Sequence, residues 1–173
     1  MKKILVVGLG YVGLAQAILL AQRFSVTCLD NDLTRVQKIN DRKSYLNEPL
    51  ISEFLKKDLN LKAVSSYEEL TDSFEAIFIA LPTPYSDEIL GFDTSIIADG
   101  LKRINDLKLS DTVVIKSTVP IGFTDIMQTK FKSKNIFFSP EFLRETKSLY
   151  DNLYPSRIVV GDTSDKADTF GKI

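Results

Sequence analysis

The chain has 173 residues, of which 44% are hydrophobic and 26% charged, and its 22 basic and 23 acidic side chains give a net charge of −1. This composition is typical of a single globular domain, and the balanced charge gives no indication of nucleic acid or an anionic membrane as a partner. The chain has no histidine and only one cysteine, Cys28. These counts exclude a Ser-His-Asp or Cys-His nucleophile, a His/Cys zinc site and an intramolecular disulfide, and no metal site is expected.

The N-terminal segment predicts a phosphate-binding turn. Residues 4–7 form a short apolar run typical of a buried strand, and residues 14–20 form an apolar helix. Between them, Gly8, Gly10 and Gly13 have the spacing G-x-G-x-x-G. In such a turn the first glycine permits a tight exit from the strand, the second lets a pyrophosphate approach the backbone, and the third lets the helix pack closely. The helix N-terminus adds unpaired N–H groups and a partial positive charge.

Asp30 strengthens this interpretation, because it ends a second expected strand at 26–29. It follows Gly8 at about the 20-residue spacing of the acid that binds an adenosine ribose. A carboxylate there accepts hydrogen bonds from both ribose hydroxyls and repels a 2′-phosphate, which favours NAD over NADP. Arg35 is a complication, since a nearby cation could tolerate that phosphate. The alternative is an ordinary β–α–β unit in which Asp30 only ends a strand.

Two lysines precede the N-terminal apolar run, so the segment up to Ala21 resembles a secretory signal peptide. The glycine spacing inside the run and the strand that follows it favour a folded unit instead. With a single cysteine in the chain, the expected location is the reducing cytoplasm, and no other stretch is long enough to span a bilayer.

Helices and strands are expected to alternate along the rest of the chain. Helices are expected at 33–40, 50–59, 66–70, 94–104 and 122–131, with a further one beginning at Ser164. Strands are expected at 62–65, 76–81, 112–116 and 135–139, with an edge strand at 157–160 and an irregular loop at 87–91. This rhythm predicts an α/β, Rossmann-type, doubly wound fold with a mainly parallel sheet and helices on both faces.

Polar segments follow two of these strands. Pro82-Thr83-Pro84 comes after the strand at 76–81, and Ser117-Thr118 comes after the strand at 112–116. The carboxyl ends of parallel strands share one edge, where ligands of open α/β sheets bind. Thr83 and Thr118 are therefore expected beside the glycine turn, although each could instead serve only the local turn or strand end.

Taken together, the motifs resemble those of the UDP-glucose 6-dehydrogenases, in the UDP-glucose/GDP-mannose dehydrogenase family. The resemblance extends from Ile4 to about Gly161 and is carried by GLGYVG (8–13), Asp30, LPTP (81–84), FDT (92–94), KSTVPIGFT (116–124), SPEFLRE (139–145) and YDNLYPSRI (150–158). It implies an NAD-dependent oxidation of UDP-glucose to UDP-glucuronate in two hydride transfers. Sibling enzymes that act on GDP-mannose or a UDP-N-acetylhexosamine are an alternative, as is a non-catalytic NAD-binding module.

The resemblance also implies site residues. The residues expected to bind NAD, from the glycine turn and the resemblance together, are Gly8, Gly10, Tyr11, Val12, Gly13, Asp30, Arg35, Thr83, Pro84, Thr118 and Glu145. Asp30 would hold the adenosine ribose, and Arg35 would lie over or beside the adenine. The residues expected to reach the nucleotide sugar, the implied partner, are Glu141, Phe142, Leu143, Arg144 and Glu145.

By the same resemblance Thr118, Glu141 and Glu145 are catalytic. Thr118 and Glu145 would hold a water, and Glu141 would activate water in thioester hydrolysis. A hydroxyl and a carboxylate can position water as a proton carrier without a histidine. The alternatives are a first-turn helix acid for Glu141 and a solvated helix face for Arg144 and Glu145.

The family's mechanism needs a cysteine nucleophile from a later segment, and Cys28 comes too early in the chain. The resemblance therefore implies that residues 1–173 form the NAD-binding domain alone. The central dimerisation helix and the C-terminal UDP-binding domain would be absent, and the chain alone would bind NAD without activity. The full-length enzyme is expected to be a homodimer.

Overall fold

The structure of the chain is a computed structural model, and it describes residues 1–163. Six strands form one sheet in the order β3-β2-β1-β4-β7-β8, and every neighbouring pair is parallel. The strands are β1 (Lys3–Val7), β2 (Ser25–Leu29), β3 (Leu61–Val64), β4 (Ala76–Ile79), β7 (Val113–Ile115) and β8 (Ile136–Phe138). The predicted doubly wound parallel sheet is therefore confirmed. The helix expected to begin at Ser164 lies outside the described residues.

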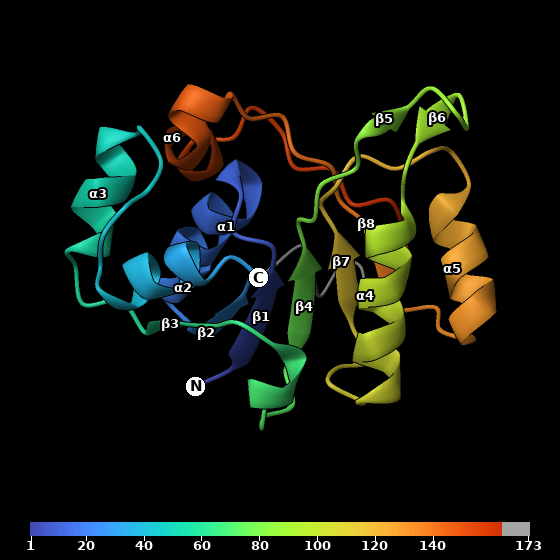
Figure 1. The fold of residues 1–173 in the computed structure, drawn as a ribbon, viewed down its shortest axis with the longest axis horizontal. Coiled ribbons are helices and arrows are strands. Elements are labelled where there is room, and N and C mark those ends of the chain that lie inside the picture. Colours follow the sequence, from blue (N-terminus) through green and yellow to red (C-terminus); the bar gives the residue numbers. More distant parts are fainter. Residues whose placement is uncertain (164–173) are drawn as a thin grey trace.

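Helices cover both faces of the sheet (Figure 1). The core of one face includes residues of α1 (Tyr11–Ala21), α2 (Leu33–Asn40), α3 (Pro49–Leu55) and α6 (Ser148–Leu153). The core of the other includes residues of α4 (Ser95–Asp106) and α5 (Phe123–Phe131). Side chains alternate along a strand, so Ile4 and Val6 pack toward α1 while Leu5 and Val7 pack toward α4. Two short 3-10 helices lie at Tyr67–Glu69 and Glu145–Lys147.

The helix expected at 66–70 is the first of these 3-10 helices, at Tyr67–Glu69. Ser66 and Glu69 form a capping box, in which the Glu69 carboxylate accepts the Ser66 N–H at 3.0 Å. The helix expected at 50–59 is shorter and ends at Leu55, because the chain turns at Lys57 to bring Leu59 into the core.

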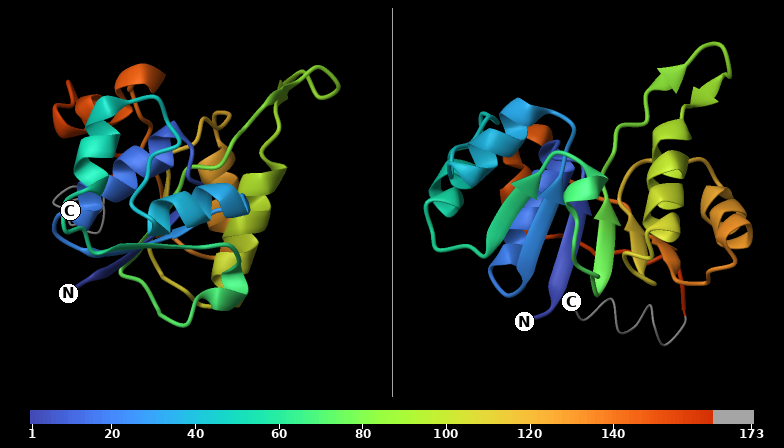
Figure 2. Two further views of the ribbon diagram at one scale, coloured as in Figure 1. Left: turned by 60° about the vertical axis from the view of Figure 1, so that its left-hand side comes forward. Right: turned by 60° about the horizontal axis from the view of Figure 1, so that its bottom comes forward.

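Two irregular regions differ from the sequence-based expectation. The segment around 87–91 is the tip of a hairpin formed by β5 (Tyr85–Ser86) and β6 (Gly91–Phe92), which extends away from the sheet (Figure 2). The edge strand expected at 157–160 is wrong. The segment approaches β8 only at its end, where the Gly161 N–H donates to the Phe138 carbonyl at 2.7 Å. Residues 157–159 are exposed and pair with no strand of the described chain.

The topology brings distant segments to one edge of the sheet. The glycine turn follows β1, Asp30 follows β2, residues 80–84 follow β4, residues 116–118 follow β7 and residues 139–141 follow β8. The strand order reverses between β1 and β4, which is the position where open α/β sheets bind their ligands. Among residues 1–163, no helix has the length and apolar character needed to cross a membrane.

Candidate functional site

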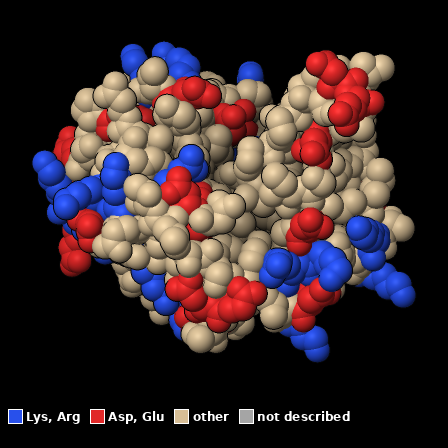
Figure 3. Space-filling model, in the orientation of Figure 1, with Lys and Arg blue, Asp and Glu red and all other residues tan. Residues whose placement is uncertain are grey.

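A cleft of about 1010 Å³ lies at this edge of the sheet. Its walls come from the segments that follow the six strands of the sheet and from one side of α4. Figure 3 shows that the surface is hollowed between the part formed by α2 and α3 and the part formed by α4, and that acidic and basic side chains are mixed on this face. The predicted residues that line the cleft are Gly8, Gly10, Tyr11, Val12, Asp30, Arg35, Thr83, Thr118, Glu141, Leu143 and Glu145. Gly13, Pro84, Phe142 and Arg144 do not line it.

The three glycines of the turn have different surroundings. Gly8 has a φ of +93°, and a Cβ there would lie 2.4 Å from the Ala80 carbonyl oxygen. A Cβ on Gly13 would lie 1.8 Å from the Gly8 carbonyl oxygen, so this glycine lets α1 pack against the turn. Gly10 has no heavy atom within 4 Å of its added Cβ. Gly8 and Gly13 therefore shape the turn, whereas Gly10 leaves space for a bound group.

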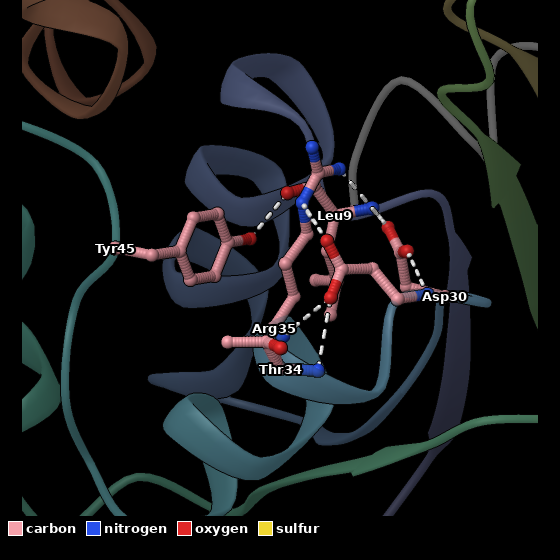
Figure 4. A network of polar contacts seen from close by, with 6 residues as sticks. Leu9, Asp30, Thr34, Arg35 and Tyr45 are labelled. Carbon is pink, nitrogen blue, oxygen red and sulfur yellow. Dashed lines mark hydrogen bonds and ion pairs between the residues drawn. The ribbon is translucent and has the colours of Figure 1, made fainter.

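Asp30 is buried, with 8% of its surface exposed, and it joins the end of β2 to the glycine turn (Figure 4). Its Oδ2 accepts the Leu9 N–H at 2.7 Å, and its Oδ1 accepts the Asp32 N–H at 2.9 Å. Each carboxylate oxygen has two lone pairs, so both can still accept a hydrogen bond from a ribose hydroxyl.

Arg35 lies beside Asp30, as the sequence indicated. Its Nη1 is 3.5 Å from Asp30 Oδ2, and its Nε is 3.3 Å from the Asp32 carboxylate. Asp32 also caps α2 by accepting the N–H groups of Thr34 and Arg35 at 2.9 and 3.2 Å. Two carboxylates thus offset the charge of the guanidinium, which favours an unphosphorylated ribose at this position.

The opposite wall of the cleft carries Lys116, Thr118, Glu141 and Glu145. The Lys116 Nζ lies 3.4 Å from the Ser139 hydroxyl oxygen and 3.5 Å from the Pro140 carbonyl oxygen. Burial lowers the pKa of Lys116 to about 8, and nearby Glu141 opposes this shift only in part. Residues 139–144 form no helix, so the interpretation of Glu141 as a first-turn helix acid is wrong. The Glu141 carboxylate instead accepts the Leu143 N–H at 2.7 Å.

Phe142 and Arg144 face a second cleft of about 790 Å³, between α1, α6 and residues 139–158. Arg144 is held there by Asp151, with its Nε and Nη2 at 3.0 and 2.7 Å from the two carboxylate oxygens. This pairing lowers the pKa of Asp151 to about 2. Residues 141–145 are thus shared between two clefts, and Lys116, Glu141 and Leu143 line both.

Sequence reasoning missed part of the cleft, including Tyr67, Asp99 and Arg103. The Tyr67 hydroxyl is buried and has no hydrogen-bond partner among residues 1–163. Burial raises its pKa to about 12, so the hydroxyl keeps its proton and can donate to a bound group. The capping box places this turn at the end of β3, but no pattern in the sequence indicates that the ring lies in the cleft.

A parallel sheet with a glycine turn after its first strand, an acid after its second and a cleft where the strand order reverses defines a dinucleotide-binding domain of the kind found in oxidoreductases. Residues 2–172 match the model of the UDP-glucose/GDP-mannose dehydrogenase family, NAD binding domain. The chain belongs to this family, and its cofactor is NAD. The structure fits this dinucleotide, because Gly10 leaves space at the N-terminus of α1 and the Asp30 carboxylate can accept further hydrogen bonds.

The curated relatives of this chain include two bacterial UDP-glucose 6-dehydrogenases. The chain is 44% identical to the Campylobacter jejuni enzyme over 99% of its own length, and 44% identical to the Streptococcus pneumoniae enzyme over 96% of its length. These alignments cover 44% and 42% of the two relatives, so the chain spans less than half of their length.

Solved structures agree with this assignment. A UDP-glucose dehydrogenase from Pyrobaculum islandicum is 29% identical and superposes with a TM-score of 0.85 over 98% of this chain and 43% of that one. A GDP-mannose dehydrogenase from Pseudomonas aeruginosa, 24% identical, also gives a TM-score of 0.85 and covers 99% of this chain and 43% of its own. The second likeness concerns the fold alone.

Proposed function

We propose that this chain is the NAD-binding part of an enzyme that oxidises UDP-glucose to UDP-glucuronate, with two NAD and one water consumed. The observation that carries the proposal is the convergence of the glycine turn and Asp30 with Thr118, Glu141 and Glu145 around one cleft. The high identity to enzymes named UDP-glucose 6-dehydrogenase supports the choice of substrate.

Bound NAD supplies the hydride acceptor, and the residues of this chain bind it and handle protons. The glycine turn would bind the diphosphate, Asp30 the adenosine ribose and Arg35 the adenine edge. Thr118 and Glu145 line the same wall and would hold a water between them, as a proton carrier that replaces the missing histidine. Glu141 lines both clefts and would accept a proton from a water that attacks the oxidised sugar.

The nucleophilic thiol of the reaction does not come from this chain. Cys28, its one cysteine, lies in β2 with 0% exposure, and burial raises the pKa of its thiol. We therefore propose that residues 1–173 form a NAD-binding domain that needs the remaining domains of its relatives for activity. The proposed setting is a homodimeric enzyme of the cytoplasm, where a free buried thiol stays reduced.

Calorimetric titration of the chain with NAD and NADP tests the cofactor site. We expect saturable binding of NAD, weaker binding of NADP and loss of NAD binding in Asp30→Ala. A folded chain that binds both dinucleotides equally would contradict the role of Asp30.

A chimera tests the reaction. The chain is joined to the portion of the Campylobacter jejuni relative that lies beyond the aligned region, and NADH formation is measured with UDP-glucose, GDP-mannose and UDP-N-acetylmannosamine. We expect activity with UDP-glucose, and a large loss of turnover in Thr118→Ala and Glu141→Gln chimeras. Preference for GDP-mannose would favour the sibling activity. NAD binding without turnover on any of the three sugars, in a folded chimera, would favour a binding module.

A further inference from the structure

Tyr45 does not line the cleft, but it forms a hydrogen bond with the glycine turn. It belongs to the loop between α2 and α3, and its hydroxyl donates a hydrogen bond to the Leu9 carbonyl (Figure 4). Burial raises the pKa of Tyr45, so the hydroxyl keeps the proton that it donates. Its ring also lies under the guanidinium of Arg35, with 5.6 Å between the Arg35 Cζ and the ring centroid.

The turn is thereby held at two consecutive peptide groups. Asp30 accepts the N–H of the Gly8–Leu9 peptide at 2.7 Å, and Tyr45 donates to the carbonyl of the Leu9–Gly10 peptide. Because a trans peptide is planar, the Gly10 N–H points opposite to the Leu9 carbonyl. In the part of the chain that the structure describes, the Gly10 N–H donates to no other group. The Tyr45 hydrogen bond therefore keeps this N–H available at the helix N-terminus.

The Leu9–Gly10 peptide group can rotate easily unless another group holds it. Gly10 has φ −70° and ψ −169°, and without a Cβ it can change φ at little cost. Rotation of this peptide would direct the Leu9 carbonyl oxygen toward the cleft in place of the N–H. A carbonyl oxygen repels an anionic diphosphate, whereas the N–H attracts it.

The loop that carries Tyr45 is fixed at both ends. Before it, the Arg42 guanidinium donates to the carbonyls of Leu61 and Leu59 at 2.8 and 3.0 Å. After it, the buried Glu48 carboxylate accepts the Leu149 N–H at 2.9 Å. Tyr45 is thus held in place by contacts that involve no bound ligand, which allows it to preorganise the turn.

We propose that Tyr45 is a positioning residue for the dinucleotide diphosphate, which it serves by fixing the orientation of the Leu9–Gly10 peptide. This inference rests on the proposed placement of the diphosphate at the glycine turn. Tyr45 acts through Leu9 and needs no contact with the dinucleotide itself.

The test compares Tyr45→Phe, which keeps the ring and removes only the hydroxyl, with Tyr85→Phe on the exposed hairpin. We expect Tyr45→Phe to weaken binding of NAD and ADP-ribose by about 3- to 10-fold, the effect of one lost hydrogen bond. Binding of adenosine, which has no phosphate, should be unchanged. Replacement of Tyr45 by p-aminophenylalanine, which restores a donor, should recover NAD affinity. Tyr85→Phe should bind as the unmodified chain does.

The ligand-free amide spectrum supplies a readout that does not depend on NAD. The Gly10 amide resonance should shift in Tyr45→Phe, because the Leu9 carbonyl of the same peptide group loses its hydrogen-bond donor. Unchanged NAD affinity in Tyr45→Phe, or equal losses for NAD and adenosine, would overturn the proposal. If the unmodified chain bound no NAD, the proposed function would fail, whereas the Gly10 amide would still report whether Tyr45 orients the peptide.

Discussion

Glu48 and Ser148 are separated by 100 positions in the chain, yet the buried Ser148 hydroxyl donates a 2.6 Å hydrogen bond to the buried Glu48 carboxylate. The other oxygen of Glu48 accepts the Leu149 N–H. This pair joins the start of α3 to the start of α6. Helix α6 also carries Asp151, which holds Arg144 in the second cleft.

Glu48→Ala should lower the free energy of unfolding by about 2–4 kcal/mol, because it leaves a buried hydroxyl and a buried N–H without their charged acceptor. Glu48→Gln keeps one acceptor oxygen and should cost less. Urea denaturation measures both. Glu53→Ala is the matched control, since Glu53 is exposed and, within residues 1–163, its one ion pair is a 3.8 Å contact with Lys57. Stability of Glu48→Ala within about 0.5 kcal/mol of the unmodified chain would show that the pair contributes little.

Gly13→Ala should lower stability, whereas Gly10→Ala should weaken NAD binding and keep the fold. The Cβ of Gly13→Ala would overlap the Gly8 carbonyl oxygen at 1.8 Å, so α1 must move and we expect loss of several kcal/mol of stability. The Cβ of Gly10→Ala meets no protein atom within 4 Å, so the fold should persist. NAD binding should weaken by about tenfold, because the Cβ occupies space expected for the diphosphate. Thermal unfolding and calorimetry separate the two effects. Full NAD affinity in Gly10→Ala would place the diphosphate elsewhere.

Lys116 should make the free energy of unfolding change with pH in the alkaline range. Its pKa is about 8 in the folded state and 10.5 in the unfolded chain. Between these values the unfolded state binds more protons, so the free energy of unfolding rises with pH. The cost of burying the charge is present in full below about pH 8. Lys116→Met removes this cost.

The measurement is urea denaturation of both proteins at about pH 7 and about pH 10. The advantage of Lys116→Met over the unmodified chain should be larger at the lower pH and shrink as pH rises. Lys134→Met, at an exposed position, controls for the loss of one lysine. An advantage that stays constant with pH would contradict the shifted pKa.

Cys28 should resist thiol reagents in the native chain. It is 0% exposed, and burial raises the pKa of its thiol, so little reactive thiolate reaches the reagent. Because it is the one cysteine among 173 residues, labelling with a disulfide reagent reports on it alone. The rate should follow unfolding as urea is added. Rapid labelling of the native chain would reopen a role for Cys28 in chemistry.

The parts of the site that could be predicted are those in which chemistry restricts residues near one another in sequence. A tight turn and a close phosphate require glycines at short spacing, and Gly8 and Gly13 have no room for a Cβ. The position of Asp30 could be predicted because one helix and one strand of ordinary length separate it from the glycine turn. Thr83 and Thr118 could be placed because parallel strands bring their carboxyl ends to one edge, and both line the cleft.

The parts that could not be predicted depend on the path of the loops. Tyr45 reaches Leu9 across 36 positions, and an aromatic residue in a polar loop gives no sign of that contact. Lys116 follows a strand and in the sequence looks like any exposed lysine. Its contacts with Ser139 and Pro140 come from a segment more than 20 positions later. The segment at 157–160 has the β-branched residues of a strand, but the hydrogen bond to β8 comes from Gly161, beyond that segment.

The central place of β1 has a consequence for the nascent chain. Of the six strands of the sheet β1 is synthesised first, yet it lies between β2 and β4, and its residue Ile4 pairs with Ala76. Until the ribosome has released β4, one side of an apolar strand keeps its backbone N–H and C=O groups unpaired. Such edges associate with other chains. Truncated translation products that end before β4 should therefore aggregate, and shielding by a chaperone should matter most in the interval before β4 emerges.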